Sequence, residues 1–357
     1  MSKLTVAVIF GGRSSEYEVS LVSGTTFLRG LSREKYDVLA VGITKEGRWL
    51  LYSGDWDRIP DNTWLESDCR PVYLTGDPTV GGFLAEKPDG TFETIHVDVL
   101  FPALHGKNGE DGTIQGLFQF SGIPYVGCNT LSSAVCMDKA VTNSLLEGMG
   151  IAQAHYLWFF AENYSGEGRD KIRLKIRERL GYPVFVKPAN AGSSVGVSKV
   201  SCEEELDAAV EKAAREDSKV EVEEAIVGQE VECAVLGNGH PIVSGVGEIA
   251  ASAEFYDYDD KYKNGTSQLY IPARLPEETA EQIRATALRA YCRLGCSGLA
   301  RVDFFVRKSD GAVLLNELNT LPGFTPISMY PKLWEAAGVP IPELLDRLIA
   351  LAFERGA

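Results

Sequence analysis

The sequence has few of the features that mark membrane or secreted proteins. Its 357 residues contain no apolar run of the roughly 18 residues that a membrane-spanning helix needs. The first three residues lead directly into the apolar segment 4–10, so no signal peptide is expected. The seven cysteines are scattered and have no CxxC spacing, which favours reduced thiols over a disulfide framework. These absences predict a cytoplasmic protein without membrane contact.

Positive charge is also scarce. The chain carries 35 Lys and Arg against 50 Asp and Glu, a net charge of −15 at pH 7. This balance argues against a general nucleic-acid binder, although it allows a local basic pocket for phosphates. The proportions of hydrophobic (45%) and charged (24%) residues are typical of a globular protein, and the length allows two or three domains.

A β-hairpin is expected near the end of the chain. One apolar run ends at Val306 and another begins at Ala312, on either side of the turn-forming pair Asp310-Gly311. A five-residue loop would pair Val306 with Ala312. Odd-numbered residues of one strand would then lie opposite odd-numbered residues of the other and share a face of the sheet.

Four polar side chains gather on that face, namely Arg301, Asp303, Glu317 and Asn319. Two carboxylates about 4 Å apart repel by roughly 4 kcal/mol at an effective dielectric of 20, so the face calls for a cation. Arg301 offsets one charge, and the remaining oxygens form the kind of set that Mg²⁺ binds together with nucleotide phosphates. The alternative is an ion-pair network on a solvated sheet face. Gly323 follows closely and can offer an exposed N–H beside the metal.

The N-terminal part has the pattern of a doubly wound α/β domain. A buried strand at 4–10 is followed by a glycine turn and a helix at 17–28. Glu18 lies in the first turn of that helix, where it either binds a ligand or interacts with the helix dipole. His105 follows a later buried strand and precedes a glycine-rich loop, so it is a candidate ligand residue. Residues 55–88 are expected to be irregular.

The middle of the chain contains a lysine and a neighbouring loop suited to phosphate binding. Lys139 lies in a predicted helix at 131–149, and Lys187 lies near the end of a strand at 183–188. The glycine- and serine-rich loop 189–196 follows, and such a loop can place N–H groups and hydroxyls on phosphates. The alternative is a mobile surface hairpin. The Lys187 charge favours the phosphate interpretation.

The remaining segments alternate between strands and helices. A strand at 220–226 presents a face made only of carboxylates, and another strand follows at 231–236. Residues 251–273 are polar and aromatic without clear periodicity, which indicates a long functional loop or lid. Helices are expected at 280–294 and at 341–354.

Taken together, these segments resemble the D-alanine–D-alanine ligases, which are ATP-grasp carboxylate–amine ligases. The resemblance rests on strings that occur in family order: GGRSSEYEVS, HGKNGEDG, MDK, FVKPANAGSSVGVSKV, EEAIVGQEVE, FYDYDDKY, RVDFF and NELNTLPGFTPISMYP. It implies an N-terminal doubly wound domain (1–128) followed by a two-lobed α+β ATP-grasp fold, with a central lobe (129–220) and a C-terminal lobe (221–357). A cytoplasmic bacterial homodimer is implied as well.

The resemblance implies binding sites for ATP and for two Mg²⁺ or Mn²⁺ ions. Lys139 and Lys187 would hold the phosphates, with the loop 189–196 folding over them. Ser193, Ser194 and Lys261 would also bind ATP. The adenine and ribose contacts would be Glu223, the Ile226 backbone and Glu230. The metal ligands would be Asp303, Glu317 and Asn319.

The resemblance also implies the handling of two D-alanines. Contacts to the first would be Glu18, which receives the ammonium group, Ser193, Tyr262 and His105. Contacts to the second, and to the developing oxyanions, would be Lys261, Ser328, Arg301 and the Gly323 N–H. ATP would phosphorylate the first D-alanine, and the amine of the second would lose a proton to Tyr262, Ser193 or His105 before it attacks. The alternatives are a D-alanine–D-serine or D-alanine–D-lactate ligase, and a non-catalytic nucleotide-binding protein.

Overall fold

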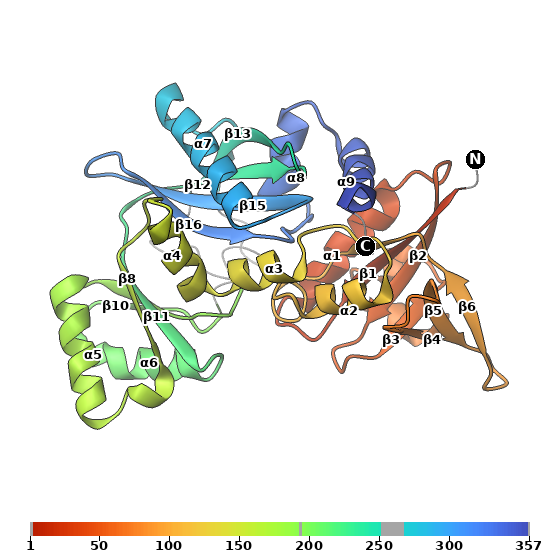
Figure 1. The fold of residues 1–357 in the computed structure, drawn as a ribbon, viewed down its shortest axis with the longest axis horizontal. Helices are drawn as coiled ribbons and strands as arrows, with labels where there is room; N and C mark the ends of the chain where they lie inside the picture. Colours follow the sequence, from red (N-terminus) through yellow and green to blue (C-terminus); the bar gives the residue numbers. More distant parts are fainter. Residues whose placement is uncertain (1–2, 193–194, 251–267, 356–357) are drawn as a thin grey trace.

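Three β-sheets organise the part of the chain that the structure describes (Figure 1). The computed structural model describes residues 3–192, 195–250 and 268–355. The strand orders are β6-β5-β4-β3-β2-β1-β7 in the first sheet, β10-β9-β11-β8 in the second and β14-β13-β12-β15-β16 in the third. Within the described ranges, no helix is long and apolar enough to cross a membrane. All seven cysteines carry free thiols, as expected.

The first sheet has a parallel centre with an antiparallel extension. Its strands are β1 (Leu4–Gly11), β2 (Tyr36–Ile43), β3 (Trp49–Tyr52), β4 (Cys69–Leu74), β5 (Gly82–Glu86), β6 (Phe92–His96) and β7 (Val99–Pro102). Strand β1 pairs in parallel with β2 and β7, which confirms the doubly wound prediction. The helices are α1 (Tyr17–Gly30) and α2 (Thr113–Ser121), with short 3₁₀ turns at η1 (Trp56–Arg58) and η2 (Trp64–Glu66).

The prediction of an irregular segment at 55–88 is wrong. It contains β4 and β5, which form antiparallel pairs at the edge of the first sheet. Val72, Phe83 and Ala85 are buried in the core of this sheet. Glycines and prolines between these strands break the alternation into pieces too short to recognise in the sequence.

The second sheet is antiparallel. Its strands are β8 (Tyr156–Phe160), β9 (Val184–Pro188), β10 (Ser198–Val200) and β11 (Lys219–Glu224). It is accompanied by η3 (Ala161–Asn163), α5 (Gly166–Arg179), η4 (Glu203–Glu205) and α6 (Leu206–Ala214). Val220 and Val222 pack into the core with Leu206 of α6, so the alternate residues Glu221 and Glu223 lie on the other face. The boundary expected between 220 and 221 falls inside β11.

The helix expected at 131–149 is divided in two. Helix α3 (Thr130–Met137) ends at Asp138, whose extended backbone begins α4 (Lys139–Gly148). The Asp138 carboxylate accepts a hydrogen bond from the Val141 N–H at 3.1 Å, which caps α4. This break places Lys139 in the first turn of α4, and Figure 1 shows both helices running between the sheets.

The third sheet carries the predicted hairpin. Its strands are β12 (Gly228–Leu236), β13 (Ile242–Ala250), β14 (Gln268–Tyr270), β15 (Leu299–Arg307) and β16 (Val313–Asn319). The helices are α7 (Glu277–Arg293), α8 (Met329–Ala336) and α9 (Ile341–Arg355). Helix α7 packs on one face, where Ile283 and Tyr291 share a core with Val302. Helix α9 shares a core with α1 and so joins this sheet to the first.

The hairpin register differs from the prediction. Val306 pairs with Val313 rather than Ala312, which lies opposite Arg307 and accepts its N–H at 2.9 Å. If this register continued along the hairpin, odd-numbered residues of β15 would lie opposite even-numbered residues of β16. A β-bulge follows, because Phe304 pairs with Leu315 while Asp303 pairs with Glu317, so that one extra residue restores the expected face.

Candidate active site

A cavity forms where the third sheet meets the loops at the carboxyl ends of β1 and β7. Six of the residues singled out from the sequence line it: His105, Arg301, Glu317, Asn319, Gly323 and Ser328. Glu16, Glu110 and Glu232 line it too, and the sequence did not single them out. The cavity therefore collects polar groups from distant parts of the chain.

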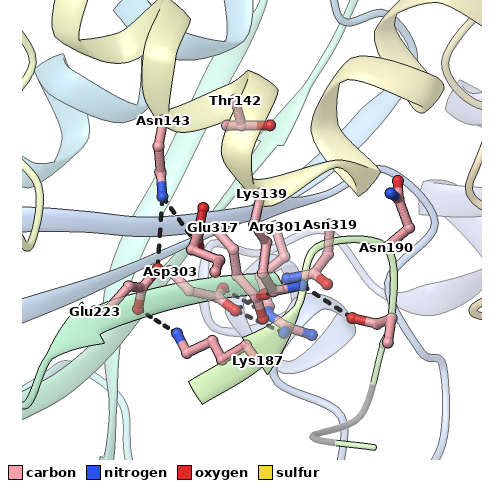
Figure 2. Close-up of polar contacts among 12 residues, drawn as sticks. Lys139, Thr142, Asn143, Lys187, Asn190, Glu223, Arg301, Asp303, Glu317 and Asn319 are labelled. Atoms are coloured by element: carbon pink, nitrogen blue, oxygen red, sulfur yellow. Dashed lines mark hydrogen bonds and ion pairs between the residues drawn. The ribbon is translucent and has the colours of Figure 1, made fainter. Parts of the chain in front are cut away.

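The face formed by Arg301, Asp303, Glu317 and Asn319, here called the strand face, is assembled as expected (Figure 2). The Arg301 guanidinium donates two hydrogen bonds of 2.8 Å to Asp303, and the Asn319 amide donates one of 3.0 Å. Glu317 pairs with Asp303 across the hairpin. The bulge keeps these groups on one side of the sheet.

Glu232, on the adjacent strand β12, completes the surroundings of Arg301. Its Oε2 lies 3.0 Å from Arg301 Nε. Burial alone would lower the pKa of the Arg301 guanidinium, but the charges of Asp303 and Glu232 raise it well above its ordinary value. Arg301 is therefore a permanently charged group held in place by two carboxylates.

The strand face also fits a hard divalent cation. The residues that the structure describes include no cluster of three Asp, Glu, His or Cys side chains able to hold a metal ion. Asp303 and Glu317 nevertheless supply two carboxylates and Asn319 an amide oxygen. Magnesium is commonly bound by one or two carboxylates together with water and substrate phosphates. The donor set thus fits Mg²⁺ or Mn²⁺ shared with a nucleotide.

Both predicted phosphate lysines lie beside acidic groups of this region. Lys139 Nζ donates to the Ala191 carbonyl at 2.9 Å and lies 3.7 Å from Glu317. The Lys187 ammonium is ion-paired with Glu223 (Figure 2). Burial would lower the pKa of Lys187, but the Glu223 charge raises it. The Lys187 ammonium group therefore remains charged, and both lysines lie close to the strand face.

The residues predicted to contact adenine and ribose lie on β11, on β12 and on the segment that connects these two strands. Glu223 is buried at the end of β11, Ile226 is half-buried in the link between strands, and Glu230 is half-buried in β12. Asn143 of α4 donates a hydrogen bond of 3.5 Å to Glu223. The residues predicted to contact the base and the ribose thus lie where the chain passes from the second sheet to the third.

Glu18 does not lie where it was expected. Its carboxylate accepts a hydrogen bond of 2.6 Å from Lys45, its side chain is 60% exposed, and it is absent from the cavity lining. Glu16 lines the cavity instead and is 7% exposed. Because Glu16 precedes the helix in the turn after β1, its carboxylate faces the crevice where such folds bind ligands.

His105 is held at the base of the cavity together with two carboxylates. Its Nδ1 lies 2.9 Å from the Leu321 carbonyl oxygen and its Nε2 lies 2.9 Å from Ser23 Oγ. Glu110 Oε1 is 3.6 Å from Nδ1. Burial would lower the pKa of His105, but Glu110 and Glu16 raise it. Glu16, His105 and Glu110 are here called the N-terminal wall.

Gly323 and Ser328 close the other side of the cavity. A Cβ at Gly323 would lie 2.9 Å from Ser328 Oγ, so only glycine leaves this approach open. The Thr325 N–H donates to Ser328 Oγ at 3.0 Å and fixes the hydroxyl. Ser193, Ser194, Lys261 and Tyr262 lie outside the described residues.

Two family models match the chain in succession. The model described as D-ala D-ala ligase N-terminus matches residues 5–128, and the one described as D-ala D-ala ligase C-terminus matches residues 145–350. The D-alanine–D-alanine ligase of Acetivibrio thermocellus is 52% identical over 99% of this chain and 96% of that protein. The corresponding ligase of Caldicellulosiruptor bescii is 49% identical, with the same two shares covered.

Solved structures agree with these matches. The VanG D-Ala:D-Ser ligase from Enterococcus faecalis is 44% identical, with a TM-score of 0.89 over 98% of this chain and all of that chain. The D-alanine–D-alanine ligase from Coxiella burnetii is 37% identical, with a TM-score of 0.84 over 99% and 96% of the two chains. Sequence models, relatives and fold coincide over nearly the whole length, and the chain belongs to the D-alanine–D-alanine ligase family.

Proposed function

We propose that the protein joins two D-alanines to D-alanyl-D-alanine with the conversion of ATP to ADP and phosphate, for peptidoglycan precursor synthesis in the bacterial cytoplasm. The observation that carries this proposal is the convergence of the strand face and the N-terminal wall on one cavity, with two half-buried lysines beside the strand face. A carboxylate substrate, a triphosphate and divalent cations each find complementary charge there.

The first step is transfer of the γ-phosphoryl group to the carboxylate of the first D-alanine. Lys139 and Lys187 hold the phosphates once each exchanges its carboxylate partner for phosphate oxygens. Asp303, Glu317 and Asn319 would hold two divalent cations, and these would neutralise charge on the phosphoryl oxygens. A substrate oxygen forms the new bond to phosphorus as ADP leaves.

The first D-alanine is held by the N-terminal wall. Glu16 receives its ammonium group, the role that the resemblance led us to expect of Glu18. His105 has both ring nitrogens engaged by Leu321 and Ser23, so it positions the wall rather than removing a proton itself. The task of accepting the proton from the second amine is left to Tyr262 or Ser193.

The second step is attack of the free amine on the acyl phosphate. A C–N bond forms, the amine loses its proton and inorganic phosphate departs. Arg301 and the Gly323 N–H stabilise the negative charge that develops on the tetrahedral oxygen, and Ser328 with Lys261 holds the second carboxylate. Removal of one such preorganised donor typically costs about 2.7–4 kcal/mol of transition-state stabilisation.

The acceptor is the least constrained part of the proposal. A structural relative at 44% identity is a D-Ala:D-Ser ligase, which keeps D-serine as the second candidate acceptor. The deciding experiment supplies purified protein with Mg²⁺, ATP, D-alanine and in turn D-alanine, D-serine or D-lactate, and identifies products by mass spectrometry. D-Alanyl-D-alanine should form fastest. Faster ADP formation with D-lactate or D-serine would change the assignment, and no D-alanine-dependent ADP would favour a non-catalytic nucleotide binder.

Homodimerisation is a separate proposal that follows from the family. Sedimentation of the purified chain at micromolar concentration should give twice the 38.9 kDa monomer mass. A monomer with full ligase activity would refute it.

A further inference from the structure

Two carboxylates share a buried face of β11 beside the proposed ATP site. Glu221 is fully buried and Glu223 is 6% exposed. Lys187 lies opposite Glu221 on β9 but forms its ion pair with Glu223. The Asn143 amide donates to both, at 3.3 Å to Glu221 and 3.5 Å to Glu223. Figure 2 shows Asn143 and Lys187 pointing toward Glu223.

The two carboxyl groups differ in their hydrogen-bond and ion-pair partners. Within the described residues, Glu221 Oε2 is buried without a hydrogen-bond donor, and its neighbour is the Glu223 carboxyl. Burial and the Glu223 charge raise the pKa of Glu221 well above its ordinary value. Burial also acts to raise the pKa of Glu223, but the Lys187 charge, the hydrogen bonds from Glu221 and Lys187 and the Lys139 charge together lower that pKa. Of the two carboxyl groups, Glu221 therefore keeps its proton to the higher pH, and Glu223 ionises first.

We propose that Glu221 is a positioning residue for the nucleotide base, whose carboxylic acid donates a hydrogen bond to Glu223 and holds that carboxylate in place as an acceptor. The inference rests on the proposed function, in which Glu223 faces the adenine of ATP. A base with an exocyclic amino group donates to Glu223. A base with a carbonyl at the same position presents a second acceptor and is disfavoured.

The proposal makes Glu221 a determinant of the preference for ATP over ITP, whose hypoxanthine carries such a carbonyl. In Glu221→Gln the amide retains a donor toward Glu223. In Glu221→Leu the volume is similar but the donor is absent, so Glu223 can turn away from the base. The pair of variants therefore separates hydrogen bonding from packing.

The test measures dissociation constants by calorimetry for Mg²⁺–ATP and Mg²⁺–ITP on the full chain, without D-alanine. We expect Glu221→Gln to bind ATP within about twofold of the unmodified protein. Glu221→Leu should weaken ATP binding by about tenfold and leave ITP within about twofold, the loss expected for one oriented hydrogen bond. Equal weakening of both nucleotides, or an unchanged preference in Glu221→Leu, would overturn the proposal.

A pH series provides a second test that needs no apolar variant. As the pH rises, Glu221 ionises and loses the donated proton, so the preference for ATP over ITP should fall in the unmodified protein and stay flat in Glu221→Gln. The ionisable groups that act on Glu221 or Lys187 are Glu223, Lys187, Lys139, Tyr156 and Glu317. The lysines contact the triphosphate of both nucleotides, so their titration cancels in the ratio. A ratio independent of pH in the unmodified protein would contradict the proposal.

These outcomes are distinguishable from failure of the proposed function. If no dipeptide forms, the ligase assignment fails, and the ATP-to-ITP ratio can still be measured. If the ratio does not respond to Glu221→Leu or to pH while dipeptide forms, only the role of Glu221 is refuted.

Discussion

The strand face and the N-terminal wall line the same cavity but are built in different ways. The strand face stands on paired strands, where every second residue points to the same side. The N-terminal wall stands on the turns that follow β1 and β7, where no such period operates. Glu16 and Glu18 illustrate the difference, because only Glu16 lines the cavity and only Glu18 pairs with Lys45. The side-chain directions of a site can be predicted from the sequence where the site lies on regular strands, but not where it lies on turns.

The largest effect should come from the strand face. Glu317→Gln removes one carboxylate of the cation site while keeping its volume. Turnover should fall by about 100-fold or more, since even residues that only support metal ligands typically contribute 10–100-fold. The measurement is ADP formation with saturating Mg²⁺, ATP and D-alanine, with a melting curve to establish that the variant folds. Turnover near that of the unmodified protein would mean that Glu317 does not hold the cation.

The second effect compares the two glutamates of the N-terminal turn. Glu16→Gln removes the charge that receives the substrate ammonium, and a hydrogen bond between charged groups is worth about 1.5–3 kcal/mol. The KM for the first D-alanine should therefore rise about 10–100-fold. Glu18→Gln is the matched control and should change KM by less than about twofold, because its ion pair with Lys45 is exposed. A larger rise in KM for Glu18→Gln than for Glu16→Gln would show that Glu18 receives the ammonium group.

The fold was predictable wherever burial enforces a clear period. The buried strands of the first sheet, both strands of the hairpin and the carboxylate face of β11 follow from apolar and polar alternation. The register at the hairpin turn was mispredicted by one residue, and only the bulge between Asp303 and Phe304 preserved the predicted face. No local pattern announces such a bulge, because it depends on how the pair of strands twists together.

Other features depend on contacts that a linear pattern does not contain. Asp138 has the side chain of a helix N-cap, a signal that could have divided the helix at 131–149. The burial of Glu221 has no such signal, since alternating carboxylates ordinarily indicate a solvated face. Glu232 was missed because its partner Arg301 is distant in the sequence and meets it only in the folded chain. Glu110 was missed although it is close to His105 in the sequence, because the turn that brings the two side chains together has no period to reveal it.

The third effect concerns the pH dependence of the N-terminal wall. The folded-state pKa of His105 is raised by Glu110 and Glu16, although burial opposes the shift. A raised pKa stabilises the fold fully below the unfolded value of about 6.5, and that contribution is lost as the pH rises through the folded-state pKa. Urea unfolding at several pH values should show the unmodified protein losing stability relative to His105→Gln as the pH increases.

Glu110→Gln provides the control for this prediction. It removes the closest carboxylate, 3.6 Å from His105, and keeps the histidine. The pH at which stability declines should move downward, because the loss of this negative charge makes the protonated ring less favourable. A difference between the unmodified protein and His105→Gln that does not vary with pH would show that His105 titrates alike in the folded and unfolded chains.

The smallest effect concerns the break that places Lys139 in the first turn of α4. Asp138→Ala removes the N-cap hydrogen bond to Val141 and should lower the free energy of unfolding by about 1 kcal/mol. Asp138→Asn keeps a capping oxygen and loses only the charge that pairs with Lys219, so it should be the more stable variant. Because Lys139 follows the cap directly, the KM for ATP should rise more in Asp138→Ala than in Asp138→Asn. Equal KM values for ATP in the two variants would show that the cap stabilises the fold but does not position Lys139 for phosphate binding.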